Sequence, residues 1–253
     1  MAFLEMRGIT KLYPENNVLA NDAVDFQVEK NEIHALVGEN GAGKTTLMKI
    51  LYGLERPDRG EILLEGRPVH IASPLDANRL GIGMVHQHFR LIPEFTIAEN
   101  VVLGLEPRRR GVFLDAEGAV RAVEQVVREY GFSIDPRLRV GGLTVGQMQL
   151  VEILKLLYRR AGLLILDEPT SVLTEQQIRK LFETLRGLKA IGKTVIIITH
   201  KLGEVKEISE RVTVMRAGHV VAVRETAQVD ERELSRLMVG RALSLQVRRE
   251  PLE

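Results

Sequence analysis

The stretch Gly38-Glu39-Asn40-Gly41-Ala42-Gly43-Lys44-Thr45-Thr46 decides the fold of this chain. It contains the spacing Gly-x4-Gly-Lys-Thr, it follows the apolar residues 33–37, and a helical pattern begins at Thr45. A phosphate-binding loop requires this context, because its glycines let successive backbone N–H groups face an anion at the start of a helix. The ammonium group of Lys44 can reach the β- and γ-phosphates, and the hydroxyl of Thr45 can bind Mg²⁺. We therefore expect all nine residues to form the binding site of a nucleotide.

An apolar run further along the chain ends in two carboxylates. Residues 163–166 read Leu-Leu-Ile-Leu, and Asp167 and Glu168 follow them directly. In a parallel sheet, ligands bind at the carboxyl ends of the strands, where the glycine-rich loop also lies. We expect Asp167 to help hold Mg²⁺ and Glu168 to orient and polarise an attacking water. The alternative is a plain acidic pair on the surface, which the glycine-rich loop disfavours.

The composition excludes several classes of function. The 35 Lys and Arg residues nearly cancel the 34 Asp and Glu residues, so the net charge of +1 provides no overall field to attract nucleic acid or an anionic membrane. The absence of cysteine excludes disulfides and cysteine-based zinc sites. No stretch approaches the roughly 18 apolar residues that a membrane-spanning helix needs, and the first residues lack the features of a secretory signal. We expect a protein that is soluble by itself and reaches a membrane only through partner subunits.

Hydrophobic periodicity divides the chain into a β/α core, a helical block and a tail. The continuous apolar runs 163–166 and 195–198 are typical of strands that are buried on both faces of a parallel sheet. From residue 89 the pattern becomes helical, with Val120, Val123 and Val127 on one helix face. The strands that we predict are 23–28, 32–37, 61–64, 67–71, 82–85, 163–166, 195–198, 211–216 and 219–224, and the helices are 45–52, 96–103, 115–130, 144–160, 174–190 and 231–239. The core then comprises residues 1–88 and 161–240, the helical block 89–160, and a linker or tail 241–253.

The helical pattern at 144–160 has a marked beginning. Leu143-Thr144-Val145-Gly146-Gln147 precedes it, and Thr144 and Gln147 have the spacing of a capping box. Such a helix start presents N–H donors and a positive dipole end, which suits a γ-phosphate. Taken alone, this segment is equally consistent with an ordinary capped helix.

Five motifs in a fixed order resemble those of ABC transporter ATPases. They are residues 38–46, Gln87, residues 143–147, residues 163–168 and His200, and the resemblance covers about residues 3 to 240. It implies an α/β fold, a phosphate-binding-loop NTPase of the ABC type. Its mixed sheet core, RecA-like and ATP-binding, is joined to an antiparallel β subdomain and an all-helical subdomain. It also implies that the chain is an ATPase that uses ATP and Mg²⁺.

The resemblance assigns roles to residues that their local sequence leaves open. It implies a head-to-tail dimer, in which Thr144, Val145, Gly146 and Gln147 contact the nucleotide of the neighbouring molecule. In the same way, Gln87 would reach Mg²⁺ and the attacking water, His200 would contact the γ-phosphate, and Tyr13 would stack on adenine. Alternative interpretations remain: a solvated loop glutamine, a structural histidine at a strand end, and a tyrosine of the core. His86 and His88 flank Gln87, but no third ligand for a metal is evident.

Departures from the common family pattern point to a subgroup. Val145 stands where glycine is usual, Thr144 where serine is usual, and residues 171–174 lack an aspartate that often ends this loop. Together with Val151-Glu152-Ile153-Leu154-Lys155, these features are similar to the first half of tandem ATPases of simple-sugar and nucleoside importers. The subgroup implies that the second ATP-binding domain is either another copy of this chain or a fused second half.

The resemblance therefore implies the motor subunit of an ABC importer at the cytoplasmic face of the membrane. Its partners would be permease subunits and, indirectly, an extracytoplasmic solute-binding protein, with a sugar or nucleoside as solute and no nucleic acid. One alternative is a soluble ABC-type ATPase that acts on nucleic acid or ribosomes. Another is a regulatory domain that binds ATP with little turnover, for which Val145 and the missing aspartate are the support.

Overall fold

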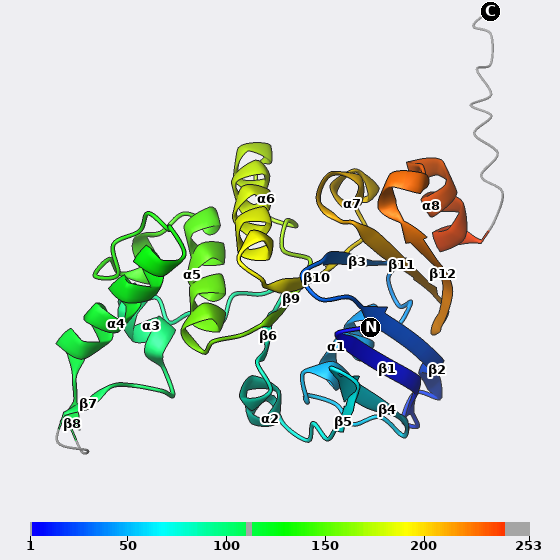
Figure 1. The fold of residues 1–253 in the computed structure, drawn as a ribbon, viewed down its shortest axis with the longest axis horizontal. Helices are drawn as coiled ribbons and strands as arrows, with labels where there is room; N and C mark the ends of the chain where they lie inside the picture. Colours follow the sequence, from blue (N-terminus) through cyan, green and yellow to red (C-terminus); the bar gives the residue numbers. More distant parts are fainter. Residues whose placement is uncertain (1, 110–112, 241–253) are drawn as a thin grey trace, which may run out of the picture.

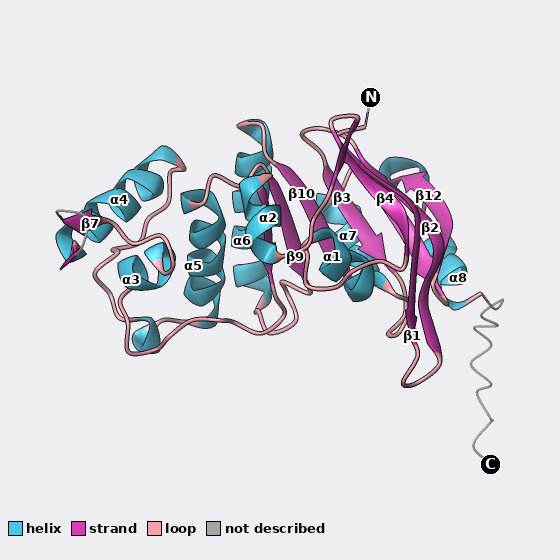
Figure 2. Ribbon diagram, turned by 90° about the horizontal axis from the view of Figure 1, so that it is seen from below, coloured by secondary structure: helices cyan, strands magenta, loops and turns pink. Residues whose placement is uncertain are grey.

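The computed structural model describes residues 2–109 and 113–240 (Figure 1). The predicted linker or tail 241–253 lies outside the described residues. Two larger sheets, a short two-stranded ribbon and the helices around them form the part of the chain that is described. In both views, helices α3 (Ile97–Val102) and α4 (Ala116–Glu129) lie at one end of the molecule, and strands β1 (Leu4–Tyr13) and β2 (Val18–Val28) lie at the other (Figures 1 and 2).

A six-stranded sheet occupies the centre, with strand order β12-β11-β3-β10-β9-β6. Its strands are β3 (Ile33–Val37), β6 (Ile82–Val85), β9 (Leu163–Asp167), β10 (Thr194–Thr199), β11 (Arg211–Arg216) and β12 (His219–Glu225). All neighbouring pairs are parallel except β11 and β12, which form an antiparallel hairpin. Every residue of β3, β6, β9 and β10 is buried, and for β9 and β10 the continuous apolar runs 163–166 and 195–198 predicted this.

Alternate residues of the central strands enter two different cores. Leu164 and Leu166 of β9 pack with helices α5 (Val145–Tyr158) and α6 (Glu175–Ala190) on one face. Leu163 and Ile165 pack on the other face with helix α1 (Lys44–Leu51) and the antiparallel sheet. Because successive side chains of a strand point to opposite faces, both layers anchor the same strand. The carboxyl end of β9 is therefore held from both sides.

The second sheet is antiparallel, with strand order β2-β1-β4-β5. Strands β4 (Arg59–Leu64) and β5 (Arg67–Val69), predicted as 61–64 and 67–71, form a hairpin around Glu65 and Gly66, which have φ values of 49° and 76°. Positive φ at both central residues is the mark of a two-residue hairpin turn. Strand β1 was not predicted, and the predicted strand 23–28 begins later than β2 does. The register of β1 against β2 shifts three times, which breaks the alternation that reveals a strand.

The block between the sheet strands β6 and β9 is largely helical, with α3, α4 and α5 packed in one core. It also contains a short ribbon, β7 (Arg108–Arg109) and β8 (Phe113–Leu114), and a 3₁₀ turn (Val140–Gly142), none of which was predicted. The remaining elements are α2 (Pro74–Arg79), α7 (Leu202–Ile208), α8 (Glu231–Val239) and a second 3₁₀ turn (Thr226–Gln228). Within the described ranges, no helix has both the length and the apolar character to cross a bilayer.

Candidate functional site

The glycine-rich loop runs from β3 to α1 in close contact with two other segments. A Cβ atom at Gly38 would lie 2.3 Å from the carbonyl oxygen of Met215, and one at Gly43 would lie 2.2 Å from that of Ala20. Gly43 is the N-cap of α1 and has φ of 96°, a region that favours glycine. These two positions accept no larger residue, so the path of the loop is set by its neighbours.

Lys44 turns back over the loop that precedes it. Its Nζ atom donates to the carbonyl oxygens of Gly38 at 2.8 Å and Glu39 at 2.9 Å. Burial lowers the pKa of Lys44, and the negative charges of Glu168 and Asp167 oppose that shift. Helix α1 has no acidic residue in its first turn and no side-chain cap, so its first N–H groups are available to an anion. The loop, the lysine and the helix start together form an anion-binding cradle.

The two carboxylates at the end of β9 differ in environment. Asp167 is 6% exposed, and burial raises its pKa, with the charge of Glu168 acting in the same direction and that of Lys44 in the opposite one. Glu168 has φ of 49°, and its N–H donates to the carbonyl oxygen of Ile198 at 2.9 Å. A residue other than glycine in this backbone region is unusual and is typical of functional positions. Glu168 thus follows the last residue of β9 in a backbone conformation that a regular strand does not have.

Glu168 and His200 lie next to each other although they are 32 positions apart in the sequence. Nδ1 of His200 is 2.9 Å from Oε1 of Glu168, a hydrogen bond that the imidazole donates when Nδ1 carries its proton. The other oxygen, Oε2, is buried and has no hydrogen-bond partner within the described chain. A buried carboxylate oxygen without a partner is costly unless a water or ligand satisfies it. This carboxylate is therefore suited to orient a water molecule.

One cavity of about 370 Å³ brings most of the predicted site residues together. Its lining consists of Tyr13, Val18, Ala20, residues 40–46, Gln87, Asp167, Glu168 and His200. Gly38 and Glu39 do not line it, and their carbonyl oxygens instead hold Lys44. The glycine-rich loop, the end of β9 and the residue after β10 thus meet at one edge of the sheet, as the parallel strands require.

Tyr13 lies at the rim of this cavity and not in the core. It is half-buried and belongs to none of the three clusters of buried apolar residues, so the alternative of a core tyrosine is wrong. It is paired across the sheet with Val18, and the Nζ atom of Lys11 lies 5.4 Å from the centre of its ring. Val18 and Ala20 line the cavity but were not predicted, because the beginning of β2 was missed. Val18 is 49% exposed in the structure, and nothing in the sequence around it marks a residue of the cavity until the strand is known.

Gln87 reaches the cavity from the loop that follows β6. The last residue of that strand, Val85, is paired with Leu166, the neighbour of Asp167. His86 contacts the ring of Tyr52 edge-on at 6.1 Å, and burial lowers the pKa of His86. In the described part of the chain, no group of three or more His, Cys, Asp or Glu side chains is arranged to hold a metal ion.

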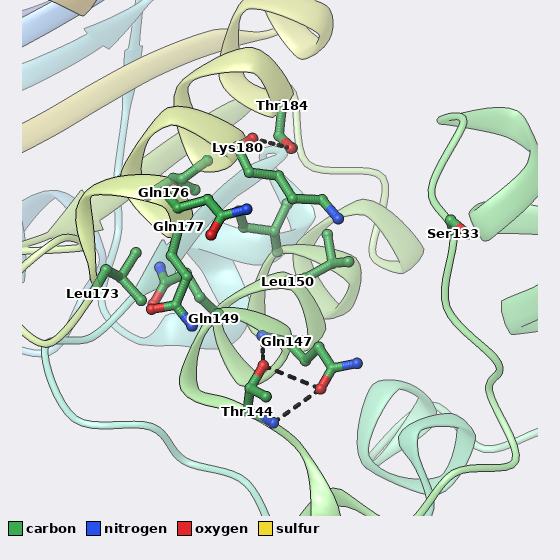
Figure 3. A pocket seen from close by; sticks show the side chains of 13 residues that line it. Ser133, Thr144, Gln147, Gln149, Leu150, Leu173, Gln176, Gln177, Lys180 and Thr184 are labelled. Carbon is green, nitrogen blue, oxygen red and sulfur yellow. Dashed lines mark hydrogen bonds between the residues drawn. The ribbon is translucent and has the colours of Figure 1, made fainter.

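The predicted contacts to a neighbouring molecule lie apart from this cavity, at the beginning of α5. Thr144 and Gln147 form the expected capping box: the N–H of Thr144 donates to Oε1 of Gln147 at 2.9 Å, and the N–H of Gln147 donates to Oγ1 of Thr144 at 3.4 Å (Figure 3). These residues and Gly146 line a second cavity, of about 350 Å³, between α5 and α6. Within one molecule they therefore cannot act on the first cavity, and their predicted role in the nucleotide site of a neighbour stays a prediction.

Fold and site together define the class of phosphate-binding-loop proteins, in which a glycine-rich loop joins a buried parallel strand to a helix beside a second strand that ends in acidic residues. A family model described as ABC transporter matches residues 21–171. The chain belongs to the ABC transporter family.

Relatives and solved structures agree with this assignment. A ribose import ATP-binding protein of Rubrobacter xylanophilus is 50% identical over 99% of this chain and 49% of its own length. A guanosine import ATP-binding protein of Bacillus subtilis is 48% identical over 95% of this chain and 47% of its own length. The chain thus spans about half the length of these curated relatives. The crystal structure of an ATP-binding cassette of an ABC transporter has a TM-score of 0.80 and 26% identity over 94% of this chain and 96% of that one.

Proposed function

We propose that this chain binds ATP with Mg²⁺ and hydrolyses it. The observation that carries the proposal is the convergence, in one cavity, of the loop with Lys44, the buried Asp167, and Glu168 held by His200. The loop amides and the ammonium group of Lys44 would bind the phosphates. Oε2 of Glu168 would accept a proton from a water molecule, and the oxygen of that water would attack the γ-phosphorus while ADP leaves. His200 would hold the carboxylate in place, and Tyr13 would stack on the base.

The residues present fit a magnesium ion. The hydroxyl of Thr45, the amide oxygen of Gln87 and the carboxylate of Asp167 all line the cavity, and Mg²⁺ prefers such oxygen donors. Burial raises the pKa of Asp167. A cation beside this carboxylate would oppose that shift and favour the charged form. When bound, the ion would neutralise part of the phosphate charge.

We further propose that the chain is the motor of an importer of a sugar or a nucleoside, at the cytoplasmic face of the membrane. The support comes from the relatives, which are named as import ATP-binding proteins for ribose and guanosine. ATP would close the first cavity of one domain against the α5 start of a second domain. That second domain would be another copy of this chain or the other half of a longer one. Permease subunits would receive the movement, and a solute-binding protein would act indirectly.

Two measurements test these proposals separately. Phosphate release from Mg-ATP by the purified chain tests hydrolysis, and a chain that binds ATP without releasing phosphate would contradict it. Affinity purification from solubilised membranes tests the partner, and we expect a permease to be recovered. Recovery of ribosomes or DNA in its place would favour the soluble ATPase.

A further inference from the structure

The segment between Gln87 and α3 is held by side chains of two helices at its main-chain groups. The N–H of Arg90 donates to Oε1 of Glu152 at 2.7 Å, and Nζ of Lys155 donates to the carbonyl oxygen of Arg90 at 3.1 Å. Two residues on, the N–H of Ile92 donates to Oδ1 of Asn100 at 2.8 Å, and Nδ2 of Asn100 donates to the carbonyl oxygen of Ile92 at 3.0 Å. Both polar main-chain groups of Arg90 and of Ile92 are therefore fixed.

Glu152 and Lys155 form an ion pair on α5, one helical turn apart, with Oε2 and Nζ 3.0 Å from each other. Their side chains are only 9% and 16% exposed. A charge in such a place is strongly destabilising without its partner, so replacing only one of the two residues would carry a large cost. We call these two side chains the Arg90 clamp. They lie about two turns after the beginning of α5, on the helix whose first residues are Thr144 to Gln147.

Gln87 lies between the Arg90 clamp and the central sheet. Val85 is fixed by its pairing with Leu166, and only four residues, 86–89, separate it from Arg90. The side chains of Gln87 and His88 are exposed and make no hydrogen bond to the described part of the chain. Because only four residues lie between the two anchors, a shift of Arg90 relative to Val85 changes the paths that are open to residues 86–89.

We propose that Glu152 and Lys155 are positioning residues that couple α5 to Gln87. When the beginning of α5 moves against a neighbouring nucleotide, the clamp carries Arg90 with it and changes the reach of Gln87 into the cavity. The effect on turnover rests on the proposed ATP hydrolysis, whereas the hold on the loop rests on the contacts alone. Both clamp residues belong to the segment 151–155, and no residue of that segment lines the nucleotide cavity.

The hold on the loop is tested by hydrogen exchange of the full chain, followed by mass spectrometry. The double variant Glu152→Leu/Lys155→Met removes the clamp without leaving an unpaired buried charge. We expect exchange in residues 87–92 to become about tenfold faster or more. Glu152→Gln/Lys155→Met keeps an acceptor for the Arg90 N–H and should give a smaller increase. Unchanged exchange in residues 87–92 in both folded variants would overturn the proposal.

A more exposed ion pair with the same kind of main-chain contact provides the control. Glu210 is paired with Lys189 at 2.7 Å and accepts from the N–H of Ile33 at 2.7 Å, outside the nucleotide cavity. The variant Glu210→Leu/Lys189→Met should leave exchange in residues 87–92 as in the wild type. An equal increase in this control would mean that loss of any such ion pair loosens the loop, which also overturns the proposal.

The coupling to Gln87 is tested by a double-mutant cycle on ATP hydrolysis. We expect loss of the clamp to lower kcat about tenfold in the wild-type background but less than about twofold when Gln87→Ala is already present. A purely structural role would lower kcat by the same factor in both backgrounds, and that result would refute the coupling. Absence of hydrolysis in the wild type would count against the proposed function, while the exchange experiment still decides the clamp.

Discussion

At the scale of single residues, Lys44 supplies the side-chain cation of the cradle. Its Nζ atom is held by the carbonyl oxygens of Gly38 and Glu39, directly at the glycine-rich loop. Hydrogen bonds to charged groups contribute roughly 1.5–3 kcal/mol, so we expect Lys44→Ala to weaken ATP binding by about ten- to a hundredfold. Titration calorimetry with Mg-ATP measures this. Lys49→Ala, on the same helix but outside the cavity, is the control, and equal affinities of both variants would contradict the assignment.

Glu168 offers a second test, because a conservative change separates binding from turnover. Glu168→Gln keeps the size of the side chain and an oxygen that can accept from His200, but it removes the charge that polarises a water. We expect ATP binding to persist and hydrolysis to fall on the order of a hundredfold or more. Single-turnover phosphate release measures the chemical step. Glu175→Gln, in the first turn of α6, is the control, and wild-type hydrolysis by Glu168→Gln would remove this residue from the role of base.

Glu32 makes stability depend on pH away from the site. Burial alone would raise its pKa, but the hydrogen bond and charge of His34, the N–H of Glu29 and the charge of Arg211 together hold the pKa of Glu32 below its ordinary value of 4.5. A lowered folded pKa means that Glu32 stabilises the fold above the unfolded pKa and that this contribution is lost as the pH falls through the folded pKa. Below pH 4.5 the free energy of unfolding should therefore fall more steeply in the wild type than in Glu32→Gln. Urea titrations from pH 6 to pH 3 measure this, and parallel curves would refute it.

At the scale of elements, the beginning of α5 separates a structural role from a functional one. Thr144→Ala removes the acceptor for the N–H of Gln147 and should cost about 0.5–2 kcal/mol of stability. Thr96 caps α3 with the same kind of capping box, so Thr96→Ala should cost a similar amount. If α5 acts on a neighbouring nucleotide, only Thr144→Ala should also lower ATP hydrolysis beyond its effect on stability. Equal hydrolysis by the two variants would leave Thr144 as an ordinary cap.

The elements also show which features a sequence reveals. The glycine-rich loop was predicted because its determinants are contiguous and each has a local physical reason. Strand β1 was missed because its register shifts break the alternation of apolar and polar residues. The contact of Glu168 with His200 joins residues far apart in the chain, so a motif can suggest each residue but not the bond between them. The support that Nδ2 of Asn21 gives to the carbonyl oxygen of Gly43, at 3.2 Å, leaves no pattern in the sequence at all.

At the scale of the whole molecule, the two halves of the proposed mechanism lie in different places. The cradle, Glu168 and His200 share one cavity, whereas Thr144 to Gln147 border another, between α5 and α6. One copy of the chain therefore places the cradle and the start of α5 at two separate cavities. The chain also spans about half the length of relatives that are themselves import ATP-binding proteins. Both observations support the proposal that the chain acts together with a second ATP-binding domain.

The last prediction concerns that partner. In Glu168→Gln, slow turnover should keep ATP in the cavity, and its γ-phosphate would then be available to the N–H groups at the beginning of α5 of a second copy. We expect Mg-ATP to shift this variant from monomer to dimer in analytical ultracentrifugation. The double variant Glu168→Gln/Lys44→Ala, with a weakened cradle, should stay monomeric. A variant that binds ATP yet remains monomeric at every ATP concentration would contradict closure between identical copies and would indicate that the partner is the other half of a longer chain.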